Sequence, residues 1–224
     1  MIQLSKRLEA IFDMASPADV ICDVGCDHGL LSRALLERGK AGYVIASDIG
    51  EGPLAAARDN MSGLGLDGKY ELVRSDGLSH LSGKKQPDTV IIAGMGGYVM
   101  GDILAGGMDI AKGCSELVLS PQSNIREFRS FLSDEGFAFL DERVVFEDGK
   151  YYVIEKVKYD TGLYKKLSDR ETALGPVLLE KKTPEFIDYL RHQKQQIMSF
   201  IDDVPVERKD ELDAFLEMIG GITD

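Results

Sequence analysis

Short apolar runs alternate with amphipathic stretches through most of the chain. The apolar runs have the length and content of buried strands and cover residues 18–24, 42–48, 69–75, 88–93 and 116–120. Helical spacing of apolar positions follows four of them, over residues 30–38, 52–63, 99–106 and 125–135. An amphipathic helix is also predicted within residues 1–12. This alternation predicts right-handed crossovers and a parallel, doubly wound α/β sheet.

The pattern changes after the last of these helices. Residues 137–145 and 150–158 are both extended and are separated by the turn-rich link FEDGK. They predict a β-hairpin that closes the sheet, with one strand antiparallel to the rest. A doubly wound sheet that ends in a hairpin differs from the ordinary dinucleotide-binding fold.

Strand patterns disappear from about residue 161. The remaining sequence predicts helices interrupted at three X-Pro steps, which are Gly175-Pro176, Thr183-Pro184 and Val204-Pro205. One apolar stripe suits an antiparallel helix pair and consists of Phe186, Leu190, Ile197 and Ile201. We therefore expect two domains, residues 1–160 with the sheet and residues 161–224 with the helices.

Composition narrows the class of protein. The chain has 224 residues, of which 44% are hydrophobic and 29% charged, and it has no apolar run of the roughly 18–20 residues that span a membrane. The first residues lack the apolar region of a signal peptide, so we expect a cytoplasmic protein. The three cysteines form no CxxC pair and the three histidines are scattered, so we expect no metal site.

The net charge of −12 argues against indiscriminate phosphate binding. A local basic patch can still exist in the C-terminal helices, where the candidates are Lys165, Lys166, Arg170, Lys181, Lys182, Arg191 and Lys194. Acidic residues are interleaved with them, so a merely solvated helix surface is the alternative. Arg126 and Arg129 could extend a basic rim beside the active site.

The first predicted strand ends in the sequence DVGCDHGLL, residues 23–31. Gly25 permits a tight turn, and Gly29 opens the next helix, whose free N–H groups face the turn. Asp27 stands where the middle glycine of a GxGxxG motif would be, so a pyrophosphate is a poor ligand here. An acidic, narrow loop better suits a cationic ligand such as S-adenosylmethionine, which carries a sulfonium and an amino group.

Two more acids end the next two predicted strands. Asp48 lies about 20 residues after the glycine loop, where a carboxylate can accept hydrogen bonds from ribose hydroxyls. Asp76 could accept from the amine of an adenine. Ligands of open α/β sheets bind outside the carboxyl ends of the strands, where Asp23, Asp48 and Asp76 all fall. Each acid alone has another interpretation, since Asp48 suits a helix cap and Asp76-Gly77 a turn.

The fourth predicted strand runs into a glycine-rich turn, AGMGGYVM. The backbone of residues 94–97 can approach a flipped base closely, and its carbonyls can accept from the amine of an adenine. The alternative is a turn into a helix with glycine for packing. Tyr98 suits either packing or base stacking, and His28 either a cap or a ligand contact. The sequence PQSN ends the fifth strand on the same rim, and its Asn124 suits the N-cap of the next helix.

The motifs DVGCDHGLL, ASDIGEGPL, RSDGL, AGMGG and PQSN together resemble one family. The chain looks like the bacterial tRNA (adenine-22, N1)-methyltransferases, which join a class I methyltransferase domain of Rossmann-like fold to a helical, coiled-coil-like C-terminal domain. The resemblance covers essentially the whole chain, and the first and fourth motifs are its most specific elements. Many members have Ser-Asp-His-Ala where this chain has Cys26-Asp27-His28-Gly29, a small-for-small change.

The resemblance implies S-adenosylmethionine as the methyl donor and tRNA as the partner. The donor-site candidates are Asp23, Gly25, Cys26, Asp27, His28, Gly29, Asp48, Ile49, Asp76, Gly77 and Gly94. The candidates at the reacting centre are His28, Gly94, Met95, Gly96, Gly97 and Tyr98. We expect a monomer or weak dimer that binds tRNA through the helical domain and binds no membrane.

Adenine N1 carries an in-plane lone pair, so its methylation requires alignment more than a general base. A paired adenine must be flipped out to expose N1, which costs a few kcal/mol. Two other functions remain open at this point. The acceptor could be rRNA, a protein or a small molecule, or the chain could hold the donor without turnover and recruit a partner through its helices.

Overall fold

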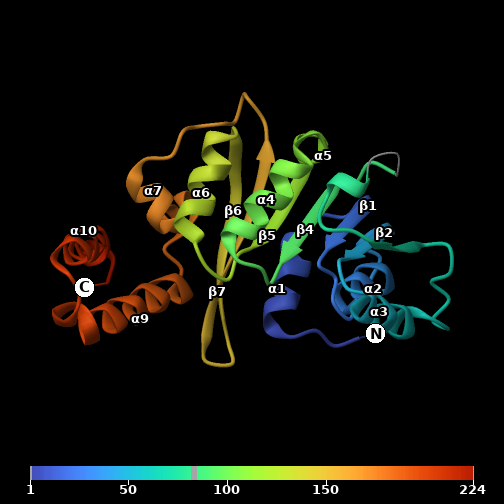
Figure 1. Ribbon diagram of the computed structural model, residues 1–224, viewed down its shortest axis with the longest axis horizontal. Helices are drawn as coiled ribbons and strands as arrows, with labels where there is room; N and C mark the ends of the chain where they lie inside the picture. The colour runs from blue at the N-terminus through green and yellow to red at the C-terminus, as the bar shows by residue number, and fades with distance from the viewer. Residues whose placement is uncertain (1, 82–84, 224) are drawn as a thin grey trace.

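One mixed sheet forms the centre of the computed structural model, which describes residues 2–81 and 85–223 (Figure 1). Its strands are β1 (Ala18–Val24), β2 (Ala41–Asp48), β3 (Tyr70–Arg74), β4 (Thr89–Ala93), β5 (Glu116–Ser120), β6 (Phe137–Glu147) and β7 (Lys150–Tyr159). Their order is β3-β2-β1-β4-β5-β7-β6. The first five pair in parallel, and β7 runs antiparallel to both β5 and β6. The predicted doubly wound sheet with a closing hairpin is confirmed.

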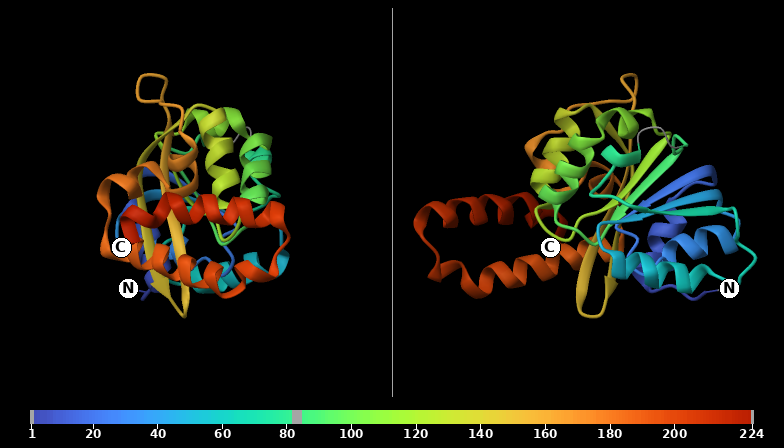
Figure 2. Two further views of the ribbon diagram at one scale, coloured as in Figure 1. Left: turned by 90° about the vertical axis from the view of Figure 1, so that its left-hand side faces the viewer. Right: turned by 45° about the vertical axis from the view of Figure 1, so that its right-hand side comes forward.

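Two layers of helices enclose this sheet (Figure 2). One layer consists of α1 (Lys6–Met14), α2 (Leu30–Glu37) and α3 (Glu51–Met61), and the other of α4 (Gly97–Gly106), α5 (Met108–Gly113) and α6 (Ile125–Asp134). Single 3-10 turns are η1 (Ser79–Leu81) and η2 (Ile201–Asp203). The sequence did not predict α5, because a helix of 6 residues between glycines is too short to display a period.

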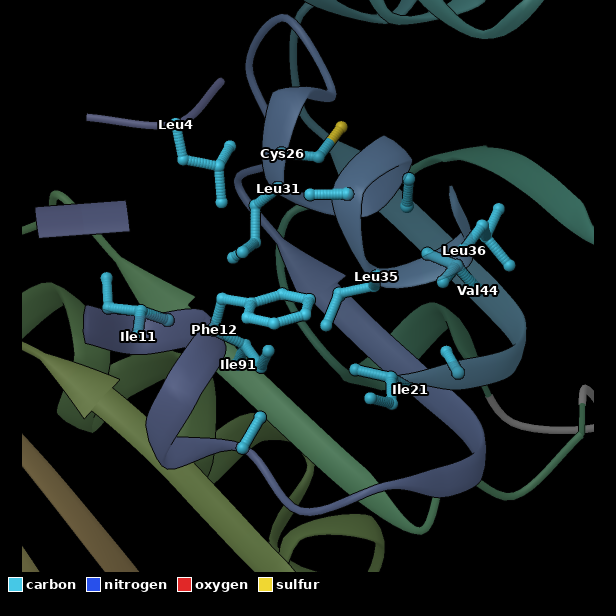
Figure 3. Packing of buried hydrophobic residues seen from close by; sticks show 14 of the residues in the cluster. Leu4, Ile11, Phe12, Ile21, Cys26, Leu31, Leu35, Leu36, Val44 and Ile91 are labelled. Atoms are coloured by element: carbon cyan, nitrogen blue, oxygen red, sulfur yellow. The ribbon is translucent and has the colours of Figure 1, made fainter. Parts of the chain in front are cut away.

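Helix α1 is fixed on the sheet by a continuous apolar core (Figure 3). The ring of Phe12 points toward Leu35 of α2, and Ile11 is completely buried. Burial of such side chains stabilises the packing by about 1.5–3 kcal/mol each. The first turn of α1 is therefore held beside the strand ends.

The β6–β7 hairpin turns at Asp148 and Gly149. Both have positive φ values, 49° and 78°, which a two-residue hairpin turn requires. Pairing continues to Glu147 and Lys150, so β6 extends two residues beyond its predicted end. The tip of this hairpin projects past the ends of the central strands (Figure 1).

The C-terminal helices are separated from one another at the predicted proline steps. They are α7 (Asp169–Leu174), α8 (Pro176–Lys181), α9 (Pro184–Phe200) and α10 (Val206–Thr223). Helices α9 and α10 project from the body as an antiparallel pair, as predicted (Figure 2). A third apolar core joins this region to the hairpin through Val144 and Val153. The domain division at residue 160 stays a prediction.

A buried ionic network crosslinks the sheet and the C-terminal helices. Arg129 of α6 is 2% exposed, and its Nη2 lies 2.9 Å from Glu142 Oε1 while its Nε lies 2.8 Å from Glu155 Oε1. The other Glu142 oxygen accepts the N–H groups of Val177 and Leu178, at 2.8 and 3.2 Å. The expectation that Arg129 extends a basic rim is wrong, because its guanidinium is buried and its charge is neutralised by buried acids.

This network makes stability depend on pH. One guanidinium balances one carboxylate, and burial raises the pKa of Glu155 to about 8, although Arg129 opposes the shift. The folded state therefore keeps a proton that the unfolded chain releases above its ordinary value of 4.5. The stability that Glu155 contributes is therefore fully present below pH 4.5 and is lost as the pH rises through about 8.

We expect the Glu155→Gln variant to gain stability relative to the unmodified protein as the pH rises from 5 to 8.5. The amide mimics the protonated acid at every pH, so the difference should grow by up to about 1.4 kcal/mol per pH unit. Urea unfolding at several pH values measures it. Parallel stability curves for the two proteins would show that Glu155 does not titrate in this range.

Candidate active site

Two adjoining cavities open at the carboxyl ends of the parallel strands. The larger measures about 450 Å³ and lies toward β3 and α4, and the smaller measures about 310 Å³ and lies toward α1 and α2. Gly25, Asp48 and Met95 line both. The sequence motifs thus converge on one elongated cleft, at the place where ligands bind open α/β sheets.

The larger cavity combines apolar walls with acids. Ile49, Val99 and Ile103 supply aliphatic surface, and Asp76 and the backbone of Gly77 lie along one side. Ile49 is 68% exposed, an unusual position for an isoleucine unless its surface covers a ligand. Such a cavity suits a flat, largely apolar ring with polar edges.

Asp48 ties the two loops that border the cleft. Its Oδ2 accepts the N–H of Asp27 at 3.2 Å, and its Oδ1 accepts that of Gly50, just before α3, at 2.9 Å. The loop after β1 is also bound to the end of β2, because the N–H groups of Gly25 and Cys26 both donate to Ser47 O, at 2.8 and 2.9 Å. Asp48 therefore both orders the helix approach and presents a carboxylate to the cleft.

The smaller cavity is strongly acidic. Asp23 is buried in its wall and accepts a hydrogen bond from Ser32 Oγ at 2.6 Å. Burial raises the pKa of Asp23 to about 6, and the Ser32 hydroxyl opposes the shift. Asp27 and His28 lie at the mouth, 3.6 Å apart and 71% and 59% exposed. His28 is held through its backbone, whose carbonyl accepts from Asn60 at 2.8 Å.

Cys26 and Gly29 pack the loop after β1 against the rest of the protein. The Cys26 side chain lies in the apolar core near Leu31 (Figure 3), and burial raises the pKa of its thiol well above the ordinary value. Gly29 begins α2 so close to α3 that a Cβ atom would lie 2.8 Å from that of Ala57. Cys26 also lines the smaller cavity, whereas Gly29 lines neither cavity and shapes the cleft through its packing.

Met95 forms the wall between the two cavities. A Cβ atom on Gly25 would lie 2.1 Å from Met95 Cε, so the thioether rests directly on the glycine. Gly25 also has φ 72°, in the left-handed region. The positive φ favours glycine here, and any larger residue would also have to displace the Met95 methyl group.

The turn at residues 94–97 is fastened to the loop after β5. Met95 O accepts the N–H of Gln122 at 2.8 Å, and Gly97 N–H donates to Ser123 O at 2.8 Å. A Cβ on Gly97 would lie 2.6 Å from Asn124 O, so this glycine serves packing. Gly96 O accepts the N–H of Met100.

Gly94 and Met95 face the smaller cavity, whereas Tyr98 points outside both cavities with 62% of its surface exposed. Asn124 takes the predicted N-cap position of α6, but without a side-chain cap. Its backbone is left-handed, with φ 54° and ψ 40°, and its side chain makes no capping hydrogen bond to the described residues of α6.

Comparison with known proteins adds to this geometry. The sequence profile of the family described as "Methyltransferase domain" matches residues 4–154. The chain belongs to this family.

Several methyltransferases of known or assigned substrate are similar over most of their length. The tRNA (adenine(22)-N(1))-methyltransferase of Bacillus subtilis is 29% identical over 214 residues, which cover 91% of this chain and 86% of that protein. A putative tRNA methyltransferase of Mycoplasma pneumoniae is 35% identical over 70% of this chain and 71% of its own. The structure of a putative tRNA (m1A22) methyltransferase from Streptococcus pneumoniae, in complex with S-adenosyl-L-methionine, superposes with a TM-score of 0.90 at 29% identity, covering 99% and 100% of the chains.

The methyltransferase cleft also contains a cation that the motifs did not indicate. Arg7 of α1 lines the smaller cavity opposite the glycine loop. The signal in the sequence is a cation within the apolar stripe of an amphipathic helix, since Arg7 lies three residues after Leu4 and four before Ile11. A charged residue at such a position has to leave the core at the nearest polar opening, here the cleft.

The proposed basic patch on the C-terminal helices is largely neutralised by acids. The ion pairs are Lys165–Glu171, Lys166–Asp134, Lys181–Asp141 and Arg191–Asp188. The interpretation as a solvated helix surface is therefore strengthened for these residues. Within residues 2–81 and 85–223, we find no cluster of His, Cys, Asp and Glu able to hold a metal ion. None of the helices in the described ranges is long and apolar enough to cross a membrane.

Proposed function

We propose that this protein transfers a methyl group from S-adenosylmethionine to N1 of adenosine 22 in tRNA. The observation that carries the proposal is the pair of cavities that meet at Gly25, Asp48 and Met95. One cavity suits an adenine ring and the other an amino acid, so together they suit a molecule that joins the two. The Bacillus subtilis and Streptococcus pneumoniae relatives, which are named for this tRNA reaction, support the acceptor.

The residues of the cleft fit this donor. S-adenosylmethionine supplies, when bound, a methyl group on a positively charged sulfur. Asp48 would accept from ribose hydroxyls, since each of its oxygens can take a second hydrogen bond beyond the loop N–H it already accepts. Ile49 and Val99 would cover the adenine faces, with Asp76 and Gly77 at the adenine edge.

The backbone at the end of β4 suits the target base. Gly94 O accepts no N–H group from the described residues, whereas the carbonyls of Met95 and Gly96 are already used. Gly94 would therefore accept from the N6 amine of a flipped adenine and align its N1 with the cleft. Because the N1 lone pair needs no deprotonation, His28 at the cavity mouth is not required as a base. The turn would therefore assist the reaction by positioning the adenine and not by transferring a proton.

Nucleoside analysis tests the proposal. The protein is incubated with labelled S-adenosylmethionine and total bacterial tRNA, and the digested RNA is examined by mass spectrometry. We expect N1-methyladenosine in tRNA and none in a tRNA transcript with guanosine at position 22. Label found only in rRNA or protein would overturn the acceptor, and donor binding without any transfer would instead favour a recruiting module.

Other features of the proposed enzyme stay predictions. They are the division into a methyltransferase domain of residues 1–160 and a tRNA-binding helical domain of residues 161–224, the state as a monomer or weak dimer, and the place of action in the cytoplasm.

A further inference from the structure

Arg7 brings an unsatisfied cation into the cleft. Its Nη1 is buried and has no hydrogen-bond partner within residues 2–81 and 85–223. Buried charged donors in folded proteins nearly always have an acceptor, so an unpaired one inside a cavity indicates an anionic ligand. Neither the methyl group nor the target base needs this cation as a partner in the proposed reaction.

The guanidinium is aimed at the end of β4. Its Nη1 lies 3.5 Å from the position that a Cβ atom on Gly94 would occupy, and Gln122 Nε2 lies 3.7 Å from the same point. The side chain is held from behind, because its guanidinium carbon lies 5.1 Å from the centre of the Tyr152 ring. The backbone N–H of Arg7 also donates to Glu147 Oε1, at 3.3 Å. Stacking on a ring fixes the direction of a guanidinium while leaving its N–H groups available.

The charges of the smaller cavity are separated. Asp23 and Asp27 lie on the glycine-loop side, and Arg7 lies on the α1 side. A ligand with one positive and one negative end matches this arrangement. An α-amino acid is such a ligand, with its ammonium toward the acids and its carboxylate toward the guanidinium.

We propose that Arg7 binds the α-carboxylate of the amino acid part of the methyl donor. This inference rests on the proposed function, because it takes the donor to be S-adenosylmethionine. Arg7 thereby makes the cleft specific for donors with an intact amino acid, and Tyr152 acts as its positioning residue. A phosphate of the RNA is the other anion that the geometry could serve, and the experiment separates the two.

Calorimetry with two ligands tests the proposal. S-adenosylhomocysteine has the carboxylate, whereas 5′-methylthioadenosine shares the nucleoside and sulfur but lacks the amino acid. We expect Arg7→Gln to weaken S-adenosylhomocysteine binding by about 10- to 100-fold and to change 5′-methylthioadenosine binding by less than about twofold. Tyr152→Leu should weaken only S-adenosylhomocysteine, by a smaller factor. Lys6→Gln is the matched control, because it removes an exposed charge from the same helix, and it should change neither.

Equal weakening of both ligands by Arg7→Gln would overturn the proposal and assign Arg7 to the fold, which thermal unfolding of the variant checks. Unchanged S-adenosylhomocysteine binding with a raised KM for tRNA would also overturn it and assign Arg7 to an RNA phosphate. The test uses binding alone. An unmodified protein that binds S-adenosylhomocysteine but methylates no RNA would therefore overturn the proposed function and still decide the role of Arg7.

Discussion

Replacement of Arg129 by Met is expected to lower the free energy of unfolding at pH 7 by about 3–5 kcal/mol, the usual effect of breaking a buried ion pair. The substitution keeps much of the side-chain volume but leaves Glu142 and Glu155 facing each other in a site with almost no solvent. Both acids would then have to be protonated, which is unfavourable at neutral pH. Urea unfolding followed by circular dichroism measures the loss.

Arg126→Met is the control for this experiment. Arg126 lies on the same helix and is exposed, so its replacement should change stability by less than about 0.5 kcal/mol. Adding Glu155→Gln to Arg129→Met should recover part of the loss, because the amide needs no proton at neutral pH, whereas the buried acid does. Equal effects of Arg126→Met and Arg129→Met would contradict the assignment of the network as a structural crosslink.

Replacement of Asp48 by Ala is expected to have the largest effect on function, a loss of about 100-fold in donor affinity. The carboxylate holds the loops at Asp27 and Gly50 and also faces both cavities. The variant therefore loses a direct ligand contact and the order of the loops that shape the cleft. Calorimetry with S-adenosylhomocysteine measures the affinity, and kcat/KM with tRNA should fall in parallel.

Two further variants separate these effects. Asp48→Asn keeps an oxygen that can accept the Gly50 N–H, so it should bind more tightly than Asp48→Ala. Glu51→Ala removes an exposed acid close by in α3, which pairs with Arg74 at 2.7 Å and lines neither cavity. It should change affinity by less than about twofold. If Glu51→Ala weakened the donor as much as Asp48→Ala, net charge rather than the Asp48 contacts would govern binding.

The features that could be predicted from the sequence are those set by local periodicity and turn chemistry. Apolar runs located each strand, and Asp148-Gly149 fixed the hairpin because few dipeptides adopt two positive φ values. The acids at strand ends were found because the topology of a parallel sheet brings all carboxyl ends to one edge. Proline placed the helix boundaries for an equally local reason, the missing N–H.

The features that escaped prediction depend on contacts between distant segments. Arg129 resembles a surface residue in sequence, and only the pairing of β6 with β7 brings Glu142 and Glu155 to it. The direction of Arg7 depends on Tyr152, which is far away in the chain. Asn124 takes the predicted N-cap position, but its backbone is left-handed and its side chain makes no capping hydrogen bond. Tertiary contacts override local preference at each of these positions.

The acids around the cleft bear on what happens after methyl transfer. The donor arrives with a positively charged sulfur and leaves with a neutral one, while Asp23, Asp27 and Asp48 stay where they are. Their Coulombic attraction for that sulfur disappears with the reaction, and opposite charges a few ångströms apart near a protein surface attract by about 4 kcal/mol at most. We therefore expect the fixed charges of the protein to favour the donor over the spent molecule, which would limit inhibition by the product.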